Sequence, residues 1–237
     1  MTEIRAQLLE MLKTVAVALG DDLRNRLVFV GGCTTALFIT DPVTLEGVRS
    51  TDDIDLIVNL AGLAEWSSLL SKLRALGFAE AVDEAVICRM RLGSLKVDFM
   101  PDDEKILGFS NRWYATGIDT AQPHSLDDGL EIRVLTPPIF VATKLEAFQA
   151  RGDDDLYYSR DAEDLLLIVD GREELLAEIP AAGYDVRDFI AQGFRGLLAN
   201  RDFDDFLEGN LRGQPGRPPI IKERFVKLSQ CDGHNAG

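Results

Sequence analysis

The chain has 237 residues, 46% hydrophobic and 27% charged, which is enough to bury a full core as one large domain or two small ones. Its formal net charge of −15 repels phosphate backbones over long range, which argues against generic DNA binding and suits a cationic partner or substrate. Three widely spaced cysteines without a Cys-x-x-Cys pair argue against a zinc knuckle or redox motif and favour a reducing, cytoplasmic setting.

The first half of the chain reads as strands alternating with helices. Residues 4–19 carry apolar residues at helical spacing up to Gly20 and lack the apolar core of a signal peptide. A β-rich run over 27–30 ends in Gly31-Gly32, and a helix is expected after this turn, over 33–39. The pattern then predicts a loop over 41–49, strands over 54–60, 86–92, 95–100 and 132–135, and a helix over 63–76. Because Gly93-Ser94 signals a hairpin among strand–helix units, we expect a mixed sheet.

The second half reads as helical. Helices are expected over 138–150, 159–169, 173–179, 186–199 and 202–211. The predicted organisation is an α/β domain over 1–136, a helical domain over 137–212 and a Pro/Gly-rich basic tail over 213–237, whose packing the pattern leaves open. No apolar run approaches the ~20 residues that a membrane helix needs, so we expect a soluble protein with no membrane partner.

The run Ser-Thr-Asp-Asp-Ile-Asp-Leu-Ile-Val over 50–58 carries the first candidate site. Asp-x-Asp also occurs over 153–155 and 202–204, but only Asp53 and Asp55 open an apolar β-run, which points both side chains to one face of a strand. Paired carboxylates repel unless a cation neutralises them, and Mg²⁺ takes one or two carboxylates together with substrate phosphates. The alternative is a solvated acidic loop that leads into a strand.

Asp98 adds a third carboxylate, flanked by Val97 and Phe99 in the expected strand over 95–100. A charge in the middle of a central strand is costly, so we expect Asp98 to face a polar site; the alternative is an edge strand facing water. Three carboxylates on neighbouring strands suit metal-assisted phosphoryl transfer, in which two hold ions and the third also positions or deprotonates the attacking hydroxyl.

The turn Gly31-Gly32-Cys33-Thr34 lies between a strand and a helix, where glycine allows close backbone approach and free N–H groups favour phosphate. Many strand–helix turns contain glycine for packing alone. The chain has neither a P-loop nor a Gly-x-Gly-x-x-Gly run, so those nucleotide-binding folds lack their fingerprint.

These pieces, in this order over residues 27 to 100, resemble the nucleotidyltransferase superfamily. Further pieces extend the resemblance to about residue 170 and point to the AbiEii/MenT group of toxin-type nucleotidyltransferases. They are Thr51-x-Asp53-Ile-Asp55-Leu56, then Lys144-Leu-Glu-Ala-Phe-Gln-Ala-Arg151, then Ser159-Arg160-Asp161-Ala-Glu-Asp164-Leu165. The resemblance implies a nucleotidyltransferase-like mixed sheet with flanking helices, followed by a helical half that completes the active-site cleft.

Carried over by position, the resemblance implies a magnesium site of Asp53, Asp55 and Asp98, with Asp161 as a further catalytic residue. It implies nucleotide binding by Gly31, Gly32, Thr34, Lys144 and Arg151. The family often carries a serine where Cys33 stands, so Thr34 or Thr35 is the candidate for its hydroxyl. Lys144 and Arg151 fall on one helix face; without the resemblance they and Asp161 would be read as surface ion pairs.

The expected activity is Mg²⁺-dependent transfer of a nucleoside monophosphate from a nucleoside triphosphate to a hydroxyl. The resemblance favours tRNA or protein as the acceptor and an antitoxin as a partner. The acidic charge favours a cationic, aminoglycoside-like small molecule as the alternative acceptor. A non-catalytic nucleotide-binding module of the same fold and an acidic domain without phosphoryl chemistry stay open as further alternatives.

Overall fold

The computed structural model of the chain describes residues 3–81, 86–126, 129–151, 155–211, 214 and 216–232. Contacts divide the chain into two units, which are described separately. Unit 1 comprises residues 1–37 and 48–136, and unit 2 comprises residues 38–47 and 137–237.

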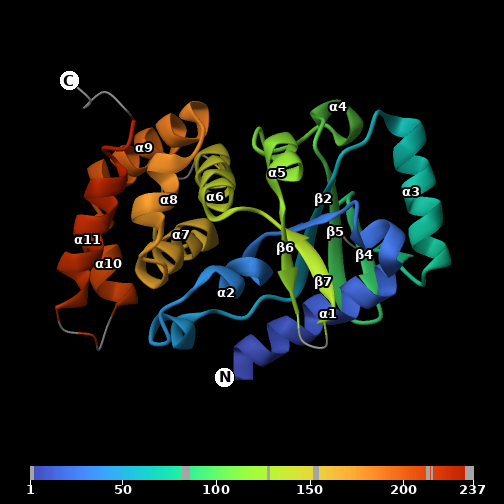
Figure 1. Cartoon of the computed structure of the whole chain (residues 1–237), viewed down its shortest axis with the longest axis horizontal. Coiled ribbons are helices and arrows are strands. Elements are labelled where there is room, and N and C mark those ends of the chain that lie inside the picture. Colours follow the sequence, from blue (N-terminus) through green and yellow to red (C-terminus); the bar gives the residue numbers. More distant parts are fainter. Residues whose placement is uncertain are drawn as a thin grey trace. The chain divides into compact units, whose positions relative to one another are not determined.

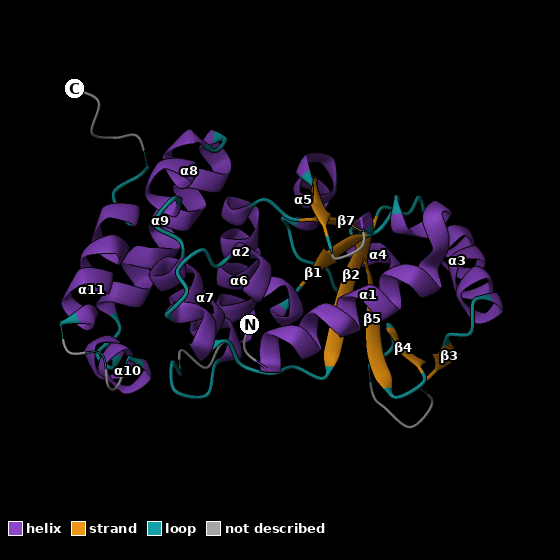
Figure 2. Cartoon of the chain, turned by 60° about the horizontal axis from the view of Figure 1, so that its bottom comes forward, coloured by secondary structure: helices purple, strands orange, loops and turns teal. Residues whose placement is uncertain are grey.

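The strands described in unit 1 form one seven-stranded sheet in the order β3-β4-β5-β2-β1-β7-β6 (Figure 2). They are β1 (Val28–Val30), β2 (Asp53–Val58), β3 (Ala79–Glu80), β4 (Arg89–Leu92), β5 (Leu95–Pro101), β6 (Gln122–Ser125) and β7 (Glu131–Val134). Strand β2 runs parallel to β5, and β1 runs parallel to β7, while the other neighbours are antiparallel. The expected mixed sheet is therefore confirmed.

Alternation along the central strands gives the sheet one apolar face. Ile54 and Leu56 of β2 pair in register with Val97 and Phe99 of β5, and all four side chains are fully buried. Helix α3 (Leu63–Ala75) buries Trp66, Leu69 and Leu73, and the ring of Phe78, beyond its end, meets the ring of Phe99 at 5.6 Å. Each such side chain contributes about 1.5–3 kcal/mol by burial, so this face fixes the register of β2 on β5.

Helix α1 (Glu3–Arg24) begins where the pattern predicts but extends beyond the predicted end at residue 19. Gly20, at φ +67°, interrupts the helical geometry, and the chain then turns into helix again up to Arg24. The glycine is thus a kink rather than a terminus, and the buried stripe continues from Leu19 to Leu23.

Several short elements of unit 1 were not predicted: β3, β6, α4 (Glu104–Leu107) and α5 (Tyr114–Thr120). Each is too short to show a clear hydrophobic period. The expected helix over 33–39 is a 3₁₀ turn η1 (Gly32–Thr34) followed by α2 (Thr35–Phe38), and the expected loop over 41–49 holds a second 3₁₀ turn, η2 (Thr44–Gly47).

Unit 2 contains a bundle of helices (Figure 1). These are α6 (Pro137–Arg151), α7 (Arg160–Gly171), α8 (Leu175–Ala181), α9 (Tyr184–Ala199), α10 (Phe203–Asn210) and α11 (Arg217–Leu228). Helix α6 contacts α7, α8 and α9. The crossing of α6 and α9 is close because Gly193 has no side chain: a Cβ at that position would lie 2.8 Å from Cδ1 of Leu145.

The C-terminal segment, whose packing the sequence pattern leaves open, contains a helix. Residues Arg217–Leu228 form helix α11, whose Ile221, Phe225 and Leu228 are buried. The ring of Phe225 packs edge-on against the rings of Phe194 and Phe203, at 5.1 and 5.2 Å. Three apolar side chains on one helix face require a partner, and α9 and α10 provide it.

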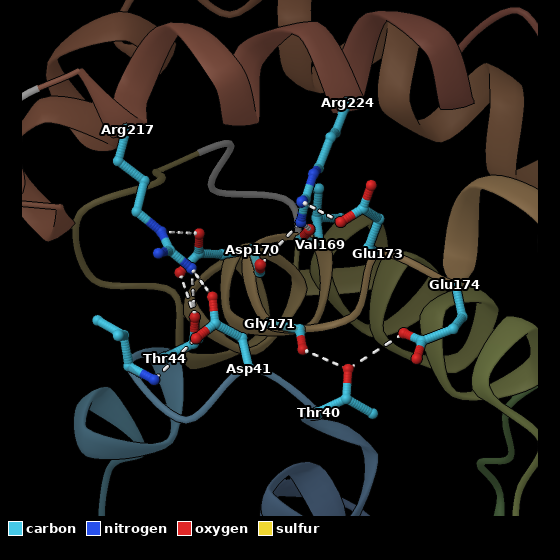
Figure 3. Close-up of polar contacts among 11 residues, drawn as sticks. Thr40, Asp41, Thr44, Val169, Asp170, Gly171, Glu173, Glu174, Arg217 and Arg224 are labelled. Carbon is cyan, nitrogen blue, oxygen red and sulfur yellow. Dashed lines mark hydrogen bonds and ion pairs between the residues drawn. The ribbon is translucent and has the colours of Figure 1, made fainter.

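Residues 38–47 also differ from prediction, because they belong to unit 2 rather than to the α/β domain. Figure 3 shows the polar contacts that hold this segment. Arg217 donates from Nε to Asp170 at 2.5 Å and from Nη2 to Asp41 and Thr44, while Thr44 donates to Asp170 at 2.8 Å. Nearby, Thr40 donates to the carbonyl of Gly171 at 3.2 Å. The segment, the end of α7 and the start of α11 are therefore joined by charge-assisted hydrogen bonds.

Candidate functional site

The register of β2 on β5 places the three predicted carboxylates together on the polar face of the sheet. Asp55 lies directly opposite Asp98, and Asp53 lies opposite Lys96. Adjacent strands are about 4.8 Å apart, and residues in register point to the same face. Asp53, Asp55 and Asp98 are thus neighbours on one surface of unit 1, two from one strand and one from the next.

Sequence reasoning missed the main partner of these carboxylates, Arg89 of β4. Its guanidinium forks onto Asp98, with Nε 2.7 Å from Oδ1 and Nη2 2.8 Å from Oδ2. The same Nη2 lies 3.6 Å from Oδ2 of Asp53. The sequence did contain a signal: a two-residue turn at Gly93-Ser94 pairs Leu92 with Leu95, and counting back pairs Arg89 with Asp98.

The two ends of this cluster differ in exposure. The side chains of Asp98 and Arg89 are 9% and 13% exposed, whereas that of Asp53 is 28% exposed. Asp53 also accepts a hydrogen bond from the hydroxyl of Thr51. The Asp98 end is thus a buried ion pair, and the Asp53 end is open to an incoming ligand.

The predicted glycine turn lies against Asp55. Gly31 has φ +75°, and a Cβ at this position would lie 1.8 Å from Oδ2 of Asp55. A side chain at position 31 would overlap Asp55, so the carboxylate of Asp55 packs directly against the backbone of Gly31. Val30, just before the turn, pairs with Asp55 in the register of β1 and β2, which fixes this contact.

The residues that follow the turn point inward. Thr34 is fully buried, and its hydroxyl donates to the carbonyl of Gly31 at 2.9 Å. Cys33 is buried, and its thiol donates to the carbonyl of Val30 at 3.2 Å. Thr35 is also buried. The hydroxyl of Thr34 is thus bonded to the backbone, whereas the buried hydroxyl of Thr35 has no hydrogen-bond partner among the described residues.

Cys88, immediately before Arg89, has a thiol pKa that its burial and the nearby carboxylates raise. Burial, and then the charges of Asp98 and Asp55, raise the pKa of its thiol to about 12. A pKa raised this far keeps the thiol of Cys88 protonated near neutral pH.

The donor chemistry of the open end suits a hard divalent cation. Asp53 and Asp55 supply carboxylate oxygens from one face of one strand, and Mg²⁺ needs only one or two protein carboxylates when water and substrate phosphates complete its shell. Within the described ranges, no three acidic, histidine or cysteine side chains form a ready-made metal-ligand set.

Lys144, Arg151 and Asp161 come together in unit 2. Nζ of Lys144 lies 3.2 Å from Oδ1 of Asp161 and 2.6 Å from Oδ2 of Asp164, and Arg151 pairs with Oδ2 of Asp161. The side chain of Asp164 is also buried, at 1% exposure. The N-terminus of α7 is capped by Ser159, whose hydroxyl accepts from the N–H of Ala162.

No protein-family model matches the chain, and no curated protein matches it significantly. These comparisons assign no family. Among the described residues, no helix is both long and apolar enough to cross a membrane.

Proposed function

We propose that the protein is a Mg²⁺-dependent nucleotidyltransferase that moves a nucleoside monophosphate from a nucleoside triphosphate to a hydroxyl acceptor. The observation that carries this proposal is the register that sets Asp55 opposite Asp98, with Asp53 beside them on the same face. The Gly31 turn, packed on Asp55, supports it, because a strand-to-helix turn next to paired carboxylates suits a metal-bound phosphate.

In the proposed reaction, the acceptor oxygen forms a bond to the α-phosphorus, the bond from that phosphorus to the bridging oxygen breaks, and pyrophosphate leaves. Asp53 and Asp55 would hold the magnesium ion, which supplies charge stabilisation on the phosphate oxygens. The hydroxyl proton leaves to water, which reaches the less buried end of the cluster at Asp53. The backbone of Gly31 keeps Asp55 in place, and Thr51 orients Asp53 through its hydrogen bond.

As the acceptor we prefer tRNA or protein, because the runs from Lys144 to Arg151 and from Ser159 to Leu165 resemble those of toxin-type nucleotidyltransferases. Toxin-type action also entails an antitoxin partner. The alternative, an aminoglycoside-like small molecule, draws its support from the net charge of −15, which favours a cationic acceptor.

The ion pair of Arg89 with Asp98 supports a second candidate function, a nucleotide-binding module without catalysis. Like charges held together without a counter-ion would be costly, but Arg89 stabilises Asp98 whether or not a metal binds. The presence of three carboxylates is therefore compatible with binding alone, and activity has to be measured.

The test incubates the full chain with each labelled nucleoside triphosphate, Mg²⁺ and, in separate arms, total tRNA, cell lysate or an aminoglycoside. We expect label transfer in one arm and its loss in the Asp53→Asn, Asp55→Asn double variant. Asp52→Asn is the matched control, because Asp52 is 71% exposed, precedes the strand and pairs with Lys96.

Transfer that survives the double substitution would refute the proposed site. If no acceptor is labelled but a nucleoside triphosphate binds in a manner that the double substitution abolishes, the binding module is the function.

A further inference from the structure

Arg89 occupies a position that a second metal ion would need. Its fork takes both oxygens of Asp98 at 2.7 and 2.8 Å, and it also approaches Asp53 at 3.6 Å. An ion bound to Asp98 would lie within about 5 Å of the guanidinium, since a Mg²⁺–oxygen bond is about 2.1 Å long. At that distance the two positive charges repel strongly, the more so at a partly buried site.

The backbone also holds the ion pair of Arg89 and Asp98 in place. Arg89 and Asp98 pair directly across the β4–β5 ladder, so the backbone register brings the two side chains together. Both side chains are largely buried, and bidentate Arg–carboxylate pairs are among the stronger charge-assisted contacts. A metal ion that displaced Arg89 from Asp98 would leave a buried guanidinium without this partner.

The positive groups of this face argue against a second divalent cation. Asp53, Asp55 and Asp98 carry three negative charges, and Arg89, Arg91 and Lys96 lie on the same face in the register of β2, β4 and β5. Lys96, opposite Asp53 in the register, forms its ion pair with exposed Asp52 at 3.0 Å. The open, less buried end of the cluster, at Asp53, is where a first cation has access.

We propose that Arg89 is a built-in counter-ion that limits this cluster to one divalent cation, held by Asp53 and Asp55, and keeps Asp98 outside the metal shell. Asp98 is then a positioning residue for Arg89 rather than the metal ligand that the sequence predicts. The inference rests on the proposed function, because it assumes that the site takes a divalent cation.

The test counts Mn²⁺ ions bound to the full chain by electron paramagnetic resonance titration, without nucleotide. The wild type should bind one ion, and the Asp53→Asn, Asp55→Asn variant none. Arg89→Met removes one positive charge next to the site, so its first ion should bind roughly tenfold more tightly.

Two further variants isolate the cause. Arg91→Met removes the same side chain two positions along β4, opposite Lys96, and should change the affinity by no more than about twofold to threefold, because screening weakens a more distant charge. Arg89→Met with Asp98→Asn removes both members of the pair, and should restore the wild-type affinity. The double variant also keeps the test valid where Arg89→Met alone fails to fold, which circular dichroism reports.

Two ions in the wild type, or equal affinities for Arg89→Met and Arg91→Met, would overturn the inference and leave the proposed function standing. Absence of Mn²⁺ binding in the wild type would overturn the inference, and the label-transfer arms would then decide the proposed function separately. One bound ion, with the expected order of affinities but no label transfer in any arm, would support the inference and remove the catalytic proposal.

Discussion

Single positions in this protein decide whether charged groups can sit close together. Gly31 makes room for the carboxylate of Asp55, and Arg89 neutralises Asp98 two strands away from that turn. Both features are local in sequence to a strand end or a hairpin, and both set the geometry of the candidate site. Substitutions at these residues therefore test structure and function together.

Replacing Gly31 by Ala should destabilise unit 1 more than a positive φ alone explains. Gly93 provides the comparison, since its φ is +61° and a Cβ there meets nothing within 4 Å. We expect Gly93→Ala to cost about 1 kcal/mol of unfolding free energy from backbone strain, and Gly31→Ala roughly 1–3 kcal/mol more from the overlap with Asp55. Urea unfolding measures both; equal losses would show that Asp55 moves aside without cost.

Contacts within one strand could be predicted from the sequence, whereas contacts between distant strands could not. Asp53 and Asp55 share a face because alternation within one strand is local, and the sequence predicted this. The pairing of Asp55 with Asp98 joins strands that are not consecutive in the chain, so its register depends on packing of the whole sheet. Arg89 could have been found from the hairpin turn, but the burial of Asp164 depends on tertiary contacts that no pattern shows.

At the scale of elements, helices α6 and α7 are joined by an ion-pair cluster of unequal members. Lys144 is 10% exposed and contacts two buried carboxylates, while Arg151, on the same helix, is 66% exposed. A buried charge without its partner is far more costly than a broken surface pair. The two cations should therefore respond very differently to the same substitution.

Lys144→Met should lower the unfolding free energy of the protein by about 3–5 kcal/mol, because Asp161 and Asp164 lose a buried counter-ion. Arg151→Met should cost less than about 1 kcal/mol, because Arg151 is exposed and the buried Asp161 keeps Lys144 as its counter-ion. Thermal and urea unfolding of the two variants measure the difference. A mild effect of Lys144→Met would mean that its structural role is small, and would strengthen the nucleotide-binding role implied by resemblance.

The hydrogen bonds of Arg217 connect α11 to α7 and to residues 38–47, and these contacts should be sensitive to acid. The hydrogen bond from Arg217 is the main cause that lowers the pKa of Asp41 below its ordinary value. Because the folded-state pKa is the lower one, this bond stabilises the fold fully above a pH of about 4, and the contribution disappears as the pH falls through the folded pKa.

In Arg217→Met, the pKa of Asp41 should rise towards its ordinary value, and acid unfolding should begin at a higher pH. Carbon NMR of the Asp41 carboxyl group measures the first effect, and circular dichroism measures the second. Lys222→Met is the matched control, since Lys222 lies on the same helix and pairs with Asp204 instead. An Asp41 pKa that responds equally to both variants would contradict the assignment.

The positions of α11 and of residues 38–47 depend on contacts that the sequence pattern does not show. Ile221, Phe225 and Leu228 have helical spacing, but the prolines and glycines before them dominate the composition of the C-terminal segment. Residues 38–47 carry no pattern that assigns them to unit 2, because their attachment rests on polar and apolar contacts with residues more than 100 positions away.

At the scale of the whole molecule, the acidic net charge should lower the melting temperature measurably. A net charge of −15 gives self-repulsion in the folded state, which salt screens. Between roughly 10 and 300 mM NaCl at pH 7.5, where the Debye length falls from about 30 Å to less than 8 Å, we expect the melting temperature to rise. Near pH 4.5, the isoelectric point of the sequence, the rise should vanish, and a rise of equal size there would point to a salt effect other than screening.

The attachment of residues 38–47 means that neither unit is one continuous stretch of the chain. The polypeptide passes from one unit to the other after residue 37, returns after residue 47 and leaves again after residue 136. A fragment that starts at Pro137 would lack the Asp41 and Thr44 that meet Arg217, so truncation cannot yield an intact unit 2. To move unit 2 into another protein, genetic exchange would have to transfer two separate segments, 38–47 and 137–237. The helical unit is therefore expected to be inherited together with the strands that lie between these segments in the chain.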